Sequence, residues 1–260
     1  MNSSKEYYVF SPWLRIFHWI MAYSVPILFF TGLYIGNPFF IGSQGIEPTY
    51  AFRQTLSMET IRYIHFITAY VFVGSFILRI YGFIMNKGDR LFPRFWTKEY
   101  WLGAKEVTLH YLFLLPQHKP YLRNPLARTS YVALYALIAI EIITGFAMYY
   151  MVNPDSWGAK IFGPWNDWLG GEYYVHLIHH YAAWMIMLSA IGHIYMVVRA
   201  DFIEREGEIS SMFSGVKFLR HEPVDLKEIA DEAEERPDRV EQPGDASPAY
   251  SANKAAPATD

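Results

Sequence analysis

The stretch IHHYAAWMIMLSAIGHIY, residues 178–195, decides the fold of this 260-residue chain. It is almost entirely apolar, yet it carries His179 and His193, fourteen residues apart. The apolar run that contains it, near residues 174–200, is long enough to cross a bilayer, which takes about 20 residues. A histidine inside a membrane span is energetically costly, so it marks a functional site by default. His179 and His193, fourteen residues apart on this span, therefore predict two buried sites at different depths.

Three further apolar runs reach the same length. They lie near residues 14–36, 61–85 and 129–152. Together the four runs predict an all-α membrane protein built as a four-transmembrane-helix bundle. No small-residue cleavage site closes the first run, so we expect an uncleaved span rather than a signal peptide.

Composition excludes several kinds of chemistry. The chain has no cysteine, which removes disulfides, iron–sulfur thiolates and covalent c-type haem attachment. Histidine, methionine, tyrosine and carboxylates remain as candidate ligands. The net charge of −3 argues against nucleic acid as a partner.

The distribution of basic residues predicts the orientation in the membrane. The loop at 86–128 carries eight Lys and Arg residues, whereas the loops at 37–60 and 153–173 carry one each, Arg53 and Lys160. The positive-inside rule therefore places the long loop and both termini in the cytoplasm.

Two segments outside the spans have distinctive compositions. Residues 96–115 mix Trp and Leu with Lys and Glu, which predicts an interfacial amphipathic helix, with an ordinary soluble helix as the alternative. Residues 222–260 are acidic and poor in aromatic side chains, which predicts a disordered cytoplasmic tail. The membrane domain is therefore expected to cover residues 1–221.

The chain contains an internal repeat. IHFITAYVFVGSFILRIY, from Ile64, aligns without gaps on the stretch from Ile178, so that His65 falls on His179 at an offset of 114. Thr31–Gly32 matches Thr144–Gly145 at an offset of 113. Two nearly equal offsets predict two parallel helix-pair repeats, related by an axis along the membrane normal.

The topology pairs the histidines by depth. His65 and His179 are expected near the outer face, and His18 and His193 near the inner face. At about 1.5 Å rise per residue, the fourteen-residue spacing separates the two levels by roughly 21 Å and returns to within about 40° of one helix face. His180 would lie about 140° from His193, so we predict His179 as the outer ligand.

Other residues are placed by the same spacing. Gly32 is expected to leave room at the outer site, and Arg79 to meet a haem propionate at the inner site, with Arg15 and Arg199 as further candidates. Glu141 lies in mid-span, where it is either a proton-path residue or a neutral, hydrogen-bonded helix contact. His110 is expected to face solvent.

With these residues placed, the chain resembles the b-type cytochrome subunits of membrane-bound nickel–iron hydrogenases, four-helix diheme cytochromes related to those of formate dehydrogenases. The resemblance covers about residues 7–220. Its stretches are YVFSPWLRIFHW, FTGLYIGNP, IRYIHF, ITGFAMY and IHHYAAWMIMLSAIGHIYMVVRADF. It implies two haems b, with His65 and His179 on the outer iron and His18 and His193 on the inner iron.

The resemblance also implies a function and partners. The chain would carry electrons in the bacterial inner membrane, from a periplasmic hydrogenase with its iron–sulfur small subunit and nickel–iron large subunit to a membrane quinone. It would not activate hydrogen itself. Candidates for a quinone site at inner depth are Arg15, Tyr195, Arg199 and Asp201. The alternatives are the same role for formate dehydrogenase or another oxidoreductase, and a haem-free scaffold or transporter.

Overall fold

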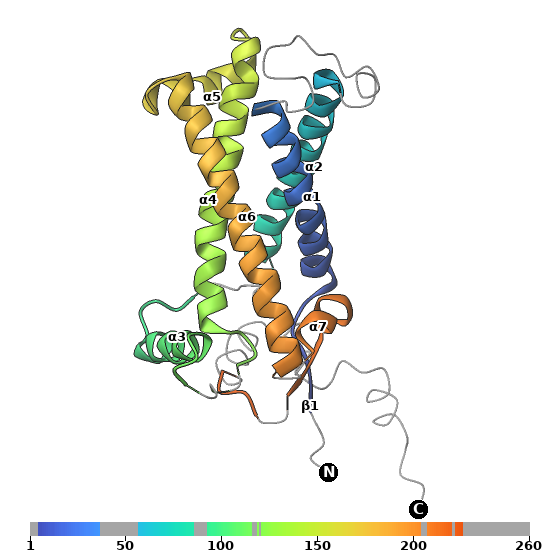
Figure 1. Ribbon diagram of the computed structural model, residues 1–260, viewed down its shortest axis with the longest axis vertical. Coiled ribbons are helices and arrows are strands. Elements are labelled where there is room, and N and C mark those ends of the chain that lie inside the picture. The colour runs from blue at the N-terminus through green and yellow to red at the C-terminus, as the bar shows by residue number, and fades with distance from the viewer. Residues whose placement is uncertain are drawn as a thin grey trace, which may run out of the picture. The chain divides into compact units, whose positions relative to one another are not determined.

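The computed structural model of the chain is dominated by four long helices (Figure 1). The residues described are 5–36, 57–85, 93–115, 119, 121–203, 207–219 and 222–225. The long helices are α1 (Pro12–Gly36), α2 (Met58–Met85), α4 (Pro125–Tyr149), which the 3₁₀ turn η2 (Tyr150–Val152) continues, and α6 (Glu172–Ile203). All four are long and apolar enough to cross a membrane, which confirms the predicted spans.

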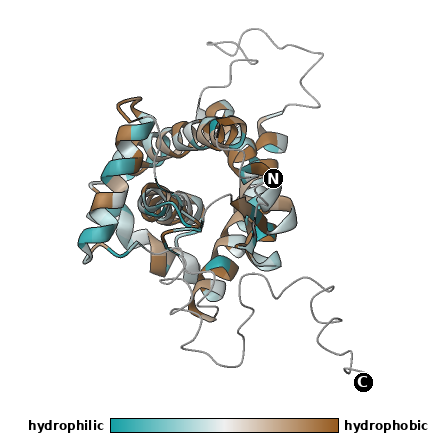
Figure 2. Ribbon diagram, turned by 90° about the horizontal axis from the view of Figure 1, so that it is seen from below, coloured by the Kyte–Doolittle hydropathy of each residue, from teal (hydrophilic) through white to brown (hydrophobic). Residues whose placement is uncertain are grey.

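The side chains of these helices are largely exposed. Only 11–22% of the residues in the most hydrophobic window of each helix are buried within the chain. Figure 2 shows brown, hydrophobic segments along the helices. In water such exposure would be unfavourable, whereas in a bilayer the lipid covers these side chains while the helix satisfies its own backbone. The chain is therefore a multi-pass membrane protein.

The chain divides into two compact units. Unit 2 comprises residues 16–79 and 133–192, and so contains parts of all four long helices. Its core is formed by Phe72 of α2, Ile138 of α4 and Ile186 of α6. Side chains of α1, among them Val25 and Leu28, pack against this cluster. The four helices of unit 2 therefore share one apolar core, as expected for a bundle.

Unit 2 also contains a helix that the sequence did not indicate, α5 (Trp157–Trp168). Ser156 caps it by accepting a hydrogen bond from the Ala159 amide. Gly158 is needed because a Cβ there would overlap the ring of Tyr150. The loop at 153–173 is thus ordered largely as a short amphipathic helix.

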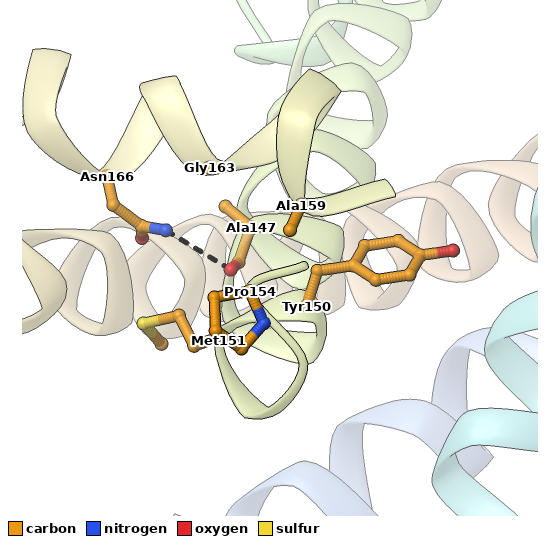
Figure 3. Close-up of a pocket in the computed structure, with 7 residues that line it drawn as sticks. All are labelled: Ala147, Tyr150, Met151, Pro154, Ala159, Gly163 and Asn166. Carbon is orange, nitrogen blue, oxygen red and sulfur yellow. Dashed lines mark hydrogen bonds between the residues drawn. The ribbon is translucent and has the colours of Figure 1, made fainter. Parts of the chain in front are cut away.

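A shallow pocket of about 400 Å³ lies where α4 and η2 meet α5. The Asn166 amide closes one side by donating to the Ala147 carbonyl at 3.2 Å (Figure 3). Its other lining residues are Tyr150, Met151, Pro154, Ala159 and Gly163.

Unit 1 comprises residues 1–15, 80–132 and 193–260. It contains a small antiparallel sheet of β1 (Lys5–Tyr8) and β2 (Val216–Leu219), and the short helix α7 (Glu208–Ser214). Tyr7 packs against Leu122 and Leu219 in a second core, where burial and then the charge of Glu222 raise the pKa of the tyrosine. The sequence did not predict this sheet, because its strands are four residues long and about 200 residues apart.

The helix predicted within 96–115 is α3 (Lys98–Tyr111), also in unit 1. It buries Val107 and exposes Trp101 and Leu102. The expectation that His110 faces solvent was wrong: it is 6% exposed and its Nδ1 donates to the Leu115 carbonyl at 3.0 Å. That carbonyl supplies the polar partner that a buried imidazole needs.

The ordered chain extends beyond the boundary predicted at 222. Asp225 is buried, and its two carboxylate oxygens each accept a backbone amide at 2.8 Å, from Leu122 and Arg123. Glu222–Asp225 therefore belong to unit 1, because buried amides need acceptors and this carboxylate provides two. The rest of the predicted tail, 226–260, lies outside the described residues.

Candidate functional site

His65 of α2 is hydrogen-bonded to Thr31 of α1. The Thr31 hydroxyl donates to the Ile27 carbonyl at 2.6 Å, which uses its only proton. The 2.8 Å contact between Thr31 Oγ1 and His65 Nδ1 must therefore be donated by the imidazole. This fixes the proton of His65 on Nδ1 and leaves the Nε2 lone pair available to a metal.

His179 of α6 repeats this arrangement with Thr144 of α4. Thr144 donates to the Ile140 carbonyl at 2.6 Å, and its Oγ1 lies 2.9 Å from His179 Nδ1. The same argument leaves Nε2 of His179 available. The duplicated sequence motif thus appears as a duplicated hydrogen-bond geometry, which the alignment of Thr31 with Thr144 could have indicated.

A glycine follows each threonine and lies against the same imidazole. A Cβ at Gly32 would lie 3.4 Å from Cε1 of His65, and a Cβ at Gly145 would lie 3.4 Å from Cε1 of His179. Gly32 was selected from the sequence as a residue that leaves room at the outer site. Gly145, the repeat equivalent of Gly32, plays the same part for His179.

Glu141 distinguishes the two halves. Its Oε2 lies 3.0 Å from His179 Nδ1, one helical turn before Thr144. At the equivalent position of the other half, offset by 113, stands Leu28. The sequence left two interpretations of Glu141 open. The structure adds a specific contact, in which the Glu141 carboxylate accepts from the imidazole of His179.

The neighbouring histidines have different partners. His180 Nε2 accepts a hydrogen bond from the Trp184 indole at 3.1 Å, which occupies the lone pair that a metal would need. His176 is exposed and its Nδ1 donates to the Glu172 carbonyl at 3.1 Å. Of the adjacent pair, the contact with Trp184 makes His180 the less suited to ligation, and the ligand role of His179 stays a prediction.

His65 and His179 could each offer a ring nitrogen to a haem iron. They lie in unit 2, on separate helices, and are close enough to interact electrostatically. Among the described residues, no group of three or more His, Cys, Asp and Glu side chains could hold a metal ion. Two imidazoles whose Nδ1 atoms are hydrogen-bonded to threonine can offer Nε2 to a metal, a donor set that fits a haem better than a tetrahedral zinc site.

The predicted inner ligands belong to different units. His18 lies in unit 2, half-buried on α1, with its ring edge-on to Trp19 at 5.3 Å between centroids. His193 lies on α6 within unit 1 and is exposed. Arg79, the predicted propionate partner, is buried in unit 2, where its Nε donates to the Tyr135 hydroxyl at 3.1 Å. The pairing of His18 with His193 stays a prediction.

All four quinone-site candidates lie in unit 1. The Arg15 guanidinium donates to the Phe213 carbonyl, which ties α1 to α7. The Arg199 guanidinium lies over the rings of Tyr111 and Phe113, at 5.5 and 5.2 Å from their centroids. Tyr195 is 59% exposed and Asp201 is half-buried.

Comparison with known proteins agrees with the resemblance seen in the sequence. Residues 9–215 match the family described as prokaryotic cytochrome b561. The probable Ni/Fe-hydrogenase B-type cytochrome subunit of Rhizobium leguminosarum bv. viciae is 34% identical over 223 residues, 83% of this chain and 90% of the relative.

Two further relatives carry similar names. The probable Ni/Fe-hydrogenase B-type cytochrome subunit of Cupriavidus necator is 33% identical over 84% of this chain and 90% of the relative. The probable Ni/Fe-hydrogenase 1 B-type cytochrome subunit of Escherichia coli (strain K12) is 31% identical over 86% of this chain and 95% of the relative. The similarity therefore covers nearly the whole of each relative.

Proposed function

Because this chain belongs to the prokaryotic cytochrome b561 family, in which its relatives are B-type cytochrome subunits of Ni/Fe hydrogenases, we propose that it conducts electrons from such a hydrogenase to a membrane quinone. A membrane cytochrome b with an electron-transfer role is common to these relatives. The iron–sulfur subunit as donor and the quinone as acceptor are the finer steps proposed. The names of the relatives favour hydrogenase over formate dehydrogenase, and a cytochrome over a haem-free transporter.

The observation that carries the proposal is the duplicated threonine–histidine pair. His65 and His179 would hold the outer haem b through Nε2, since Thr31 and Thr144 accept hydrogen bonds from their Nδ1–H groups. Such an acceptor behind a ligating imidazole fixes both its tautomer and its ring orientation. A bound haem supplies one-electron transfer, and the chain supplies ligation, orientation and the surrounding charge.

A second haem b at the inner level is proposed with His18 and His193 as ligands. Arg79 is the proposed partner of a propionate, because a guanidinium pairs strongly with a carboxylate away from water. The quinone is proposed to bind near Arg15, Tyr195, Arg199 and Asp201. Guanidinium and phenol groups there can donate hydrogen bonds to quinone oxygens, and a carboxylate can take part in proton transfer.

The proposed orientation places both termini in the cytoplasm of a bacterial cell, with the protein in the inner membrane. The basic loop at 86–128 supports this side assignment through the positive-inside rule. Within that loop, α3 exposes Trp101 and Leu102, which suits a helix lying on the inner surface of the bilayer.

The opposite loops are the proposed docking surface for the hydrogenase. Of these, residues 37–56 lie outside the described residues. In the other loop, α5 exposes Trp157 at 69% and Trp168 at 75%. The same helix lines the pocket of Figure 3 through Ala159, Gly163 and Asn166. Exposed tryptophans of this kind are typical anchors of protein interfaces and of the membrane boundary.

The purified chain tests the proposal through its spectrum. We expect a b-type α-band in the reduced-minus-oxidised spectrum and two haems per chain by pyridine haemochrome assay. Reconstituted with its hydrogenase in liposomes, the complex should reduce a quinone with hydrogen, and the hydrogenase alone should not. A purified chain without a b-type spectrum would refute the proposal.

A further inference from the structure

The two halves of the outer site differ in the side chain that precedes the threonine by one turn. On α1 this residue is Leu28, and on α4 it is Glu141. The remainder of the motif, threonine, glycine and histidine, is the same in both halves. One imidazole therefore has a neutral acceptor only, and the other has a carboxylate in addition.

The carboxylate is placed to act on His179 alone. Its Oε2 is 3.0 Å from His179 Nδ1, which is also 2.9 Å from Thr144 Oγ1, so the two oxygens share one imidazole proton. The Glu141 side chain is 15% exposed, and its Oε1 is buried without a hydrogen-bond partner among the described residues. An ionisable group in mid-span is costly unless it is paired, and its pair here is the imidazole N–H.

We propose that Glu141 is a positioning residue that lowers the reduction potential of the outer haem by accepting a hydrogen bond from the Nδ1–H group of His179. The inference rests on the proposed function, in which His179 ligates that haem. It assigns to Glu141 a role within electron transfer that needs no proton path.

Two physical effects act in the same direction. A carboxylate that accepts the distal N–H makes the imidazole a stronger base and thus a better donor to oxidised iron. The negative charge also favours the oxidised state, which carries one more positive charge than the reduced state, and weak screening inside the membrane enlarges this preference. Leu28 offers neither effect, so only one axial ligand is influenced.

A lower potential at the outer level has a directional consequence. An electron that arrives there is held less tightly, which favours its departure toward the quinone. A carboxylate beside one ligand would thus bias the flow without altering the pair of histidines that carries it.

Redox titration of the full chain with its haems bound tests the proposal. The variant Glu141→Gln keeps an acceptor oxygen but removes the charge, whereas Glu141→Leu copies the Leu28 half. Glu172→Gln is the matched control, because it removes an exposed charge from the first turn of α6. The outer haem is identified as the one lost in His179→Ala.

We expect Glu141→Gln to shift the equilibrium of the outer haem about tenfold toward the reduced form, which is 59 mV for one electron. Glu141→Leu should shift it at least as far, while the other haem and the Glu172→Gln control stay unchanged. The low-spin spectrum should show a weaker axial field in both Glu141 variants. These shifts are independent of turnover by the hydrogenase.

Other outcomes would overturn the inference. An unchanged outer potential in Glu141→Gln and Glu141→Leu would show that the carboxylate has no influence on it. Equal shifts of both haems would point to a general charge effect. Loss of haem from both variants would make Glu141 a residue of cofactor retention instead. Absence of haem from the unmodified chain would refute the proposed function itself, which separates the two failures.

Discussion

The α1–α2 half and the α4–α6 half of unit 2 each contain the same arrangement of a threonine, a glycine and a histidine. In each half, a histidine on one helix is hydrogen-bonded to a threonine on the other. The glycine after that threonine leaves room beside the edge of the imidazole. The halves differ at Leu28 and Glu141. The duplication thus accounts for the matched histidine–threonine geometry, and the difference between Leu28 and Glu141 gives the two imidazoles unequal electrostatic surroundings.

Removing the histidines is expected to have the largest effect on the two halves. We expect His65→Ala and His179→Ala to abolish the outer haem, because one of the two imidazoles proposed to hold it would be gone and the other would have to hold it alone. Haem content and the α-band of the purified variants measure this loss.

His180→Ala is the matched control for His179→Ala. Its Nε2 accepts the Trp184 indole, so the substitution should leave haem content unchanged and remove only one exposed hydrogen bond. If His180→Ala lost the haem and His179→Ala kept it, the assignment of the ligand on α6 would be wrong.

The four spans, the proposed ligand histidines and the two threonines show which features the sequence could predict. The four spans and the preference for His179 over His180 followed from hydrophobic length and helical periodicity, which are local properties. The repeat predicted that Thr31 and Thr144 are equivalent, but not that each accepts an imidazole proton. That contact depends on the rotation of α1 against α2, and of α4 against α6, which a linear pattern does not encode.

Two of the features that sequence reasoning missed are non-local. The sheet of β1 and β2 and the capture of Asp225 by the Leu122 and Arg123 amides join segments about 100 to 200 residues apart. Neither has a periodic signal. His110 was misplaced for a different reason: its partner, the Leu115 carbonyl, is near in sequence, but it belongs to the irregular turn after α3, which has no periodic pattern.

The glycines give the second test of the comparison. Gly32→Val and Gly145→Val would push methyl groups toward imidazoles that an ideal Cβ already approaches to 3.4 Å. Overpacking of this kind costs about 1–3 kcal/mol, so we expect clearly weaker haem retention in both variants. Heat-induced haem release, followed at the Soret band, compares the two halves directly.

Gly74→Val is the control, because a Cβ at Gly74 would meet nothing within 4 Å. It changes the same residue type within α2 without approaching His65. Haem release as fast in Gly74→Val as in Gly32→Val would mean that any added bulk in the helices is harmful, and that the glycines beside the histidines have no special part.

The threonines give the smallest and most discriminating effect. Thr31→Val removes the hydroxyl that accepts the His65 N–H and leaves that donor with the backbone carbonyl of Leu28, which costs about 1–3 kcal/mol to the extent that this carbonyl does not satisfy it. Thr144→Val should cost less, about 0.5–1.5 kcal/mol, because His179 still donates to Glu141. Haem release should therefore be faster in Thr31→Val than in Thr144→Val.

The double variant Thr144→Val with Glu141→Leu tests the reason for this inequality. It removes both acceptors from His179 and should lower haem retention to the level of Thr31→Val, because the two imidazoles would then have the same surroundings. If Thr144→Val alone already equals Thr31→Val, the carboxylate does not substitute for the threonine, and the two halves differ in charge without differing in how firmly they orient their ligands.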